Sequence, residues 1–130
     1  MQLLRLARVA APRLRDLRSS AARVAVQLTY ANDVSLAQSP RWFAVYPPAR
    51  AHFVYACAFS DCDGMHDLDD EVFRMLRSTT SQATGVRHCF GRRSCRTGQG
   101  PRCGLGLTFE VTVIYEAPRH ETAGRLALTT

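Results

Sequence analysis

The sequence predicts an α+β fold: a small, mostly antiparallel sheet of four to five strands with one packed helix and a basic N-terminal helix. Two patterns carry this prediction. Residues 105–115 alternate apolar and polar side chains as a long strand does, and residues 68–78 place apolar side chains at helical spacing after an acidic start. A chain of 130 residues suffices for one core. We therefore expect a single domain over 23–116, with a basic segment over 1–22 and a flexible tail over 117–130.

The first thirty residues fit two patterns. Apolar side chains recur every three or four residues and predict a helix to about residue 22: Leu3, Ala7, Ala10, Leu14, Leu17, Ala21, Val24 and Leu28. Pro12 would kink this helix. From Val24 to Tyr30, apolar residues alternate with smaller or polar ones, which favours a strand.

The positive charge is concentrated in the same segment. Residues 1–31 contain six arginines and one aspartate, a net charge of +5, whereas residues 32–130 carry only +1. A nearly neutral body argues against a nucleic-acid surface, which needs its excess charge on the folded part. An arginine-rich, acid-poor start is typical of organellar import, so import is the alternative to the cytoplasmic location that we expect.

Two further strands are predicted in the first half of the domain. Residues 41–46 are aromatic and β-prone, and Pro47 and Pro48 end that stretch. In residues 52–59 one face of a strand gathers four side chains: Phe53, Tyr55, Cys57 and Phe59. A short strand near 85–90 followed by a long loop to residue 104 completes the elements before the last strand.

The helix at 68–78 accounts for most of the acids around it. Asp67 can cap its first turn, where acidic side chains favour the positive end of the helix dipole: Asp69, Asp70 and Glu71. Its predicted buried stripe is Leu68, Val72, Met75 and Leu76. Gly85 is the expected stop for a weak tail of this helix.

Five cysteines, an odd number, cannot form a closed disulfide set. Arg5, Arg8 and Pro12 interrupt the apolar core that a secretory signal needs, and no apolar run approaches the roughly 20 residues of a membrane-spanning helix. We therefore expect a reducing compartment, where clustered cysteines bind metal more often than they form disulfides.

Glycines indicate which four cysteines would share a metal ion. A cysteine turn at a metal needs backbone N–H groups directed at the sulfur, which a glycine with positive φ permits. Glycine follows within two residues of Cys62, Cys89 and Cys103, but not of Cys95. Cys57 lies close enough to Cys62 for a first pair. The predicted ligands of a zinc ion are therefore Cys57, Cys62, Cys89 and Cys103, with His66 and His88 as substitutes.

Residues 52–116, with these four cysteines between predicted strands, resemble zinc-ribbon-type domains in layout. The resemblance implies a small antiparallel sheet pinned by a structural zinc. The helix at 68–78 and the 13 residues between Cys89 and Cys103 depart from the usual pattern of two short knuckles.

Two other motifs are rejected on spacing. An EF-hand loop that started at Asp61 would need glycine at position 6 and glutamate at position 12, where this chain has His66 and Val72. A phosphatase loop needs five residues between its cysteine and its arginine, but six separate Cys89 from Arg96.

The sequence thus favours a non-catalytic zinc-binding interaction or adaptor module that binds a protein partner, because no nucleophile and base can be paired. A thiol enzyme or redox sensor is the alternative, since Cys95 lies between Arg93 and Arg96, which favour a thiolate. A weak nucleic-acid binder that stacks bases on Trp42 ranks third.

Overall fold

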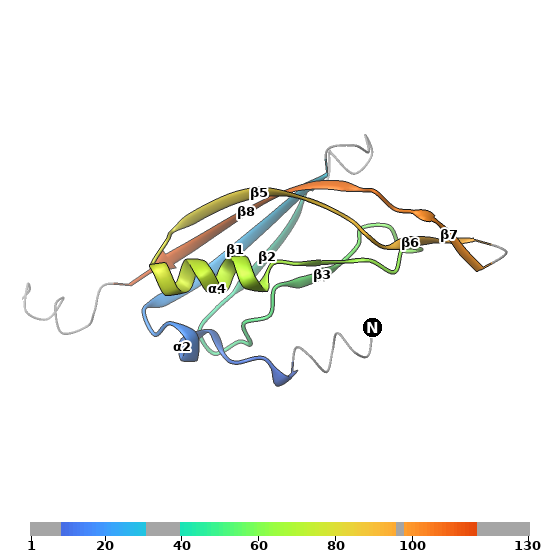
Figure 1. The fold of residues 1–130 in the computed structure, drawn as a ribbon. Helices are drawn as coiled ribbons and strands as arrows, with labels where there is room; N and C mark the ends of the chain where they lie inside the picture. The colour runs from blue at the N-terminus through green and yellow to red at the C-terminus, as the bar shows by residue number, and fades with distance from the viewer. Residues whose placement is uncertain (1–8, 31–39, 96–97, 117–130) are drawn as a thin grey trace, which may run out of the picture.

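The computed structural model describes residues 9–30, 40–95 and 98–116, with the backbone alone for residues 95, 98 and 99. The fold is α+β, as predicted, and its main element is a four-stranded antiparallel sheet in the order β2-β1-β8-β5. Two smaller antiparallel sheets lie beside it (Figure 1). One pairs β3 (Val54–Ala56) with β4 (Met65–Asp67), and the other pairs β6 (Arg92–Cys95) with β7 (Gly98–Arg102). The strands of the main sheet are β1 (Ala21–Tyr30), β2 (Arg41–Val45), β5 (Gln82–His88) and β8 (Gly106–Tyr115).

The two longest strands form the centre of the main sheet. β1 and β8 pair along almost their whole length, with Val24 opposite Val113 and Tyr30 opposite Leu107. Alternate residues of both strands are buried on one face, as the pattern at 105–115 predicted. The buried residues of this face are Val24, Val26, Leu28, Tyr30, Leu107, Phe109, Val111 and Val113.

A single long helix covers part of that face. Helix α4 (Asp69–Ser78) lies against the sheet (Figure 1). Its buried side chains, Val72, Met75 and Leu76, belong to the same core cluster as the buried residues of that face. Asp67 accepts a hydrogen bond from the N–H of Asp69 at 2.9 Å, so it satisfies a free N–H in the first turn as expected. At the other end, the hydroxyl of Tyr115 lies 2.8 Å from the carbonyl of Thr80 and ties the end of the helix to β8.

The predicted strand at 52–59 is shorter than expected. β3 spans Val54–Ala56 and pairs with β4, Met65–Asp67. The alternation still holds, because Phe53, Tyr55 and Cys57 are buried. Cys57 therefore lies just after a strand rather than within one.

The expected helix to residue 22 holds only in part over the described residues. Residues 9–10 are helical and α2 covers Leu14–Leu17, but the two are separate and β1 already begins at Ala21. The strand is favoured over the helix because β1 pairs with β2 on one side and β8 on the other. Backbone N–H and C=O groups of β1 can therefore form hydrogen bonds on both sides. Residues 1–8, which include much of the proposed import signal, and the tail at 117–130 lie outside the described part.

Gly85 does not stop the helix. α4 ends at Ser78, and Thr79 adopts the left-handed conformation that closes it, with φ of 56°. Gly85 instead lies inside β5, where the ring of Phe109 occupies the space that a Cβ atom would need. Within the described residues, no helix is long and apolar enough to cross a membrane.

Candidate metal centre

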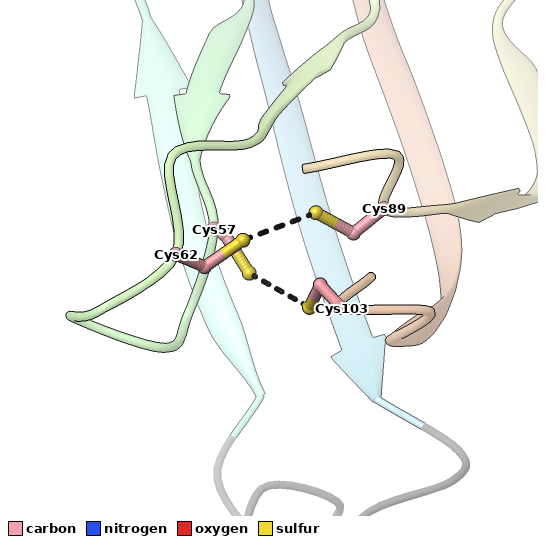
Figure 2. Close-up of side chains that lie close together, drawn as sticks. All are labelled: Cys57, Cys62, Cys89 and Cys103. Carbon is pink, nitrogen blue, oxygen red and sulfur yellow. Dashed lines mark hydrogen bonds between the residues drawn. The ribbon is translucent and has the colours of Figure 1, made fainter. Parts of the chain in front are cut away.

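Four cysteines from three loops meet at one end of the small sheets. Cys57 follows β3, Cys62 lies in the loop before β4, Cys89 follows β5, and Cys103 follows β7 (Gly98–Arg102). Their four Sγ atoms all lie within 4.8 Å of one another. Figure 2 shows the first two reaching toward the last two from opposite sides.

The spacing of the sulfurs matches a tetrahedral site. The Sγ atoms of Cys62 and Cys89 are 3.6 Å apart, and those of Cys57 and Cys103 are 3.7 Å apart. With Zn–S bonds of about 2.3 Å, the edge of a tetrahedron of sulfurs is about 3.8 Å. A disulfide would need about 2.05 Å. The arrangement therefore has the size of a four-thiolate metal site.

Two loops with the same Cys-x-Gly pattern direct N–H groups at sulfur. The N–H of Gly64 lies 3.3 Å from the Sγ of Cys62, and the N–H of Gly91 lies 3.4 Å from the Sγ of Cys89. These are the contacts that the glycine spacing predicted. Such hydrogen bonds favour a thiolate over a thiol.

The reason for glycine differs from the expected one at these two positions. Of the described glycines, only Gly104 has positive φ, at 63°. Gly64 and Gly91 are needed because the loops touch: a Cβ atom on Gly64 would overlap the Sγ of Cys89, and one on Gly91 would overlap the backbone of Gly64. Close approach, rather than backbone conformation, requires glycine there.

Backbone hydrogen bonds fix the loops around the sulfurs. The N–H of Cys57 donates to the carbonyl of Gly64 at 3.0 Å, and the N–H of Cys103 donates to that of Gly91 at 2.8 Å. In this way Cys57 is tied to the glycine that follows Cys62, and Cys103 is tied to the glycine that follows Cys89. The four side chains are held in place by main-chain geometry, which is the condition for a preformed site.

The two aspartates beside Cys62 join the loop between β3 and β4 to β6. The carboxylate of Asp61 accepts a hydrogen bond from the Nε of Arg93 at 2.7 Å, and that of Asp63 accepts one from the N–H of Arg92 at 2.7 Å. Cys62 and Arg93 also form an antiparallel bridge. Both arginines belong to β6 (Arg92–Cys95), which pairs with β7 in what was expected to be a loop.

Charge balance explains why the aspartates are tolerated beside sulfur. The guanidinium of Arg93 also lies 4.0 Å from the ring centre of Phe59, so it is held between a carboxylate and an aromatic face. The sequence signal for this pairing is the opposite charge of the Asp-Cys-Asp stretch at 61–63 and the Arg-Arg-Ser stretch at 92–94.

The thiols of the cluster differ in their pKa values. Burial raises the pKa of Cys89 to about 11 and that of Cys57 still further. Burial acts against the thiolate of Cys62 as well, but the N–H of Gly64 and the neighbouring thiols outweigh it, so its pKa lies below the ordinary value. A bound dication would stabilise the deprotonated form of its thiol ligands.

The substitute histidines do not join the cluster. Neither His66 nor His88 belongs to the group of residues whose ligand atoms lie within 4.8 Å of one another. His88 is exposed, while His66 is buried on β4, where its ring centre lies 6.5 Å from that of Tyr30. The side chain of Cys95, the candidate sensor, lies outside the described part of the chain.

His66 predicts a dependence of stability on pH. Burial lowers its pKa, and the charge of Arg41 lowers it further. Above the unfolded value of about 6.5 the ring is neutral in both states, so there is no penalty. Below it only the unfolded chain takes up the proton, so stability is lost as the pH falls from about 6.5 toward the folded pKa, by at most about 1.4 kcal/mol per pH unit.

His66→Gln tests this, because glutamine fills a similar volume and does not titrate. We expect the difference in unfolding free energy between wild type and variant to shrink between pH 7.5 and pH 5.5. Protonation of the cysteines affects both proteins alike and cancels in the difference. A difference that stays constant over this range would contradict the prediction.

Among the described residues, the four cysteines are therefore the set that can hold a metal ion, and their loops keep them together. Their geometry is compatible with a metal-binding site. Neither the protein-family models, nor the curated proteins, nor the solved structures with which the chain was compared match it.

Proposed function

We propose that Cys57, Cys62, Cys89 and Cys103 bind one zinc ion through four thiolates, and that the protein is a non-catalytic interaction module built around it. The observation that carries the metal is the approach of four sulfurs within 4.8 Å. Zinc suits an all-thiolate tetrahedral site of this size. Four protein ligands also fill its coordination, which is typical of structural zinc, whereas catalytic zinc keeps a position open for water.

The proposed zinc would stabilise the part of the molecule that has the least core. β3-β4 and β6-β7 are separate pairs of short strands, and such pairs are marginal alone. The ligands come from both: the loop between β3 and β4 supplies two, and the chain flanking β6-β7 supplies the others. A metal shared by the two halves would join them to each other and to the end of the main sheet. Thiolate ligation also requires reduced cysteines, which supports a reducing compartment such as the cytoplasm.

The experiment is elemental analysis of protein purified without chelator or affinity metal, together with a count of titratable thiols. We expect about one zinc per chain and a single thiol that reacts readily under native conditions, from Cys95. After denaturation with a chelator all five cysteines should react. Protein without metal and with five reactive thiols in the native state would overturn the proposal.

A further inference from the structure

A groove runs along the outer edge of β2, away from the cysteines. In the described part of the chain, β2 lies at the end of the main sheet and pairs with β1 alone. Four consecutive residues of this strand, 42–45, line one hollow of about 590 Å³. Successive strand residues point to opposite faces, so a hollow that all four touch must follow the edge. Among the residues that the structure describes, the groove therefore presents the unpaired backbone of an edge strand.

Aromatic side chains form much of the groove. Trp42 is 65% exposed although it is the largest side chain of the strand. Phe43 is held in place because its ring stacks on that of Tyr55, with 4.1 Å between the ring centres. Exposed aromatic side chains on a rigid element are enriched at protein interfaces. One feature that commonly prevents an edge strand from pairing with another chain is proline, and 41–45 contains none.

Arg50 brings positive charge to the groove. Arg50 lines the hollow and is the bridge partner of Arg13, so two arginines meet side by side. In the described residues neither has a carboxylate within 4.0 Å, although Arg50 donates to the carbonyl of Ala11 at 3.0 Å, which fixes its position. Like charges on directly opposed residues repel, and a partner's carboxylate would relieve that repulsion.

We propose that this groove binds an extended acidic segment of a partner protein, which adds a strand to the edge of β2. Backbone hydrogen bonds to β2 would provide affinity, an apolar side chain would cover Trp42, and a carboxylate would pair with Arg50. The inference rests on the interaction role proposed above and gives it a class of partner. None of the residues that line the groove is a cysteine of the metal centre.

Trp42 is the only tryptophan in the chain, so intrinsic fluorescence reports this groove directly. The probe is a short capped peptide in which glutamate and valine alternate, and its control has arginine in place of glutamate. We expect the acidic peptide to shift the emission of Trp42 to shorter wavelength with saturation, more weakly as salt rises, and the basic peptide to leave it unchanged.

Arg50→Glu should weaken the binding of the acidic peptide by about tenfold or more, because the substitution replaces electrostatic attraction by repulsion. Arg102→Glu, an exposed change on β7, is the matched control and should leave the affinity unchanged. No shift with the acidic peptide, or equal binding by both variants, would overturn the inference. A blue shift that grows with protein concentration alone, with a dimer in light scattering, would also overturn it and assign the groove to a second copy.

Zinc content measured on the same samples separates the two proposals. Absence of peptide binding by protein that holds about one zinc per chain removes the groove inference and leaves the metal centre. Peptide binding by protein without zinc removes the metal centre and supports the groove.

Discussion

Cys89→Ser is expected to abolish stoichiometric zinc binding and to destabilise the protein by about 3 kcal/mol or more, a fall in Tm on the order of 15 °C. Cys89 is only 3% exposed, and its Sγ lies 3.6 Å from that of Cys62. A water molecule that replaced this sulfur as a ligand would therefore disturb the packing around it. Serine oxygen is also a poor ligand for a thiolate site. Thermal unfolding and elemental analysis measure the two effects.

A chelator separates loss of metal from loss of packing. If zinc stabilises the folded state, removal of zinc from the wild type should lower its Tm toward that of Cys89→Ser, and chelator should have no effect on the variant. Cys95→Ser is the matched control and should keep both the metal and the Tm. Equal loss of zinc in both serine variants, or a wild-type Tm that ignores chelator, would contradict the four-cysteine site.

Gly91→Ala is expected to lower the unfolding free energy by about 2–4 kcal/mol and to weaken metal binding. The added Cβ would overlap the backbone N and Cα of Gly64, so a main chain, rather than a flexible side chain, would have to move. Movement of that loop would also displace the N–H that Gly64 directs at Cys62. Chemical denaturation and a competition assay for zinc measure the two losses.

Gly104→Ala provides the contrast. Its φ is 63°, but no atom lies within 4 Å of the position of a Cβ. Only the strain of the left-handed conformation, about 1 kcal/mol, should appear, and the metal should be retained. If both variants lost the same stability and the same metal affinity, close approach of the two loops would not be the reason for Gly91.

The sequence predicts well where one physical cause decides the outcome. The alternation at 105–115 can be satisfied only by a strand with one buried face, and β8 has that face. The four cysteines that the glycine spacing selected do lie together. Two of them, Cys62 and Cys89, are followed two residues later by a glycine that the structure requires. Gly64 and Gly91 were selected for positive φ and are required by contact between loops instead.

Long-range pairing explains what the sequence did not predict. The helical stripe before residue 22 is real as a pattern, but β1 finds partners in β2 and β8, which no local pattern contains. The β6-β7 pair was missed because its arginines and glycines lack an alternating apolar face. Its bonds to Asp61 and Asp63 depend on two loops that meet only in the folded chain.

The central pairing of β1 with β8 also determines when the protein can fold during synthesis. The strand that contains Val24 pairs with the one that contains Val113, so the middle of the sheet joins two ends of the described chain. Closing so long a loop is slow, and β1 must remain unpaired on one side until β8 leaves the ribosome. During that interval the nascent chain exposes an aggregation-prone strand, and Cys103, like β8, arrives late. Capture of the proposed zinc and completion of the core are therefore expected as nearly simultaneous, late events in the folding of this domain.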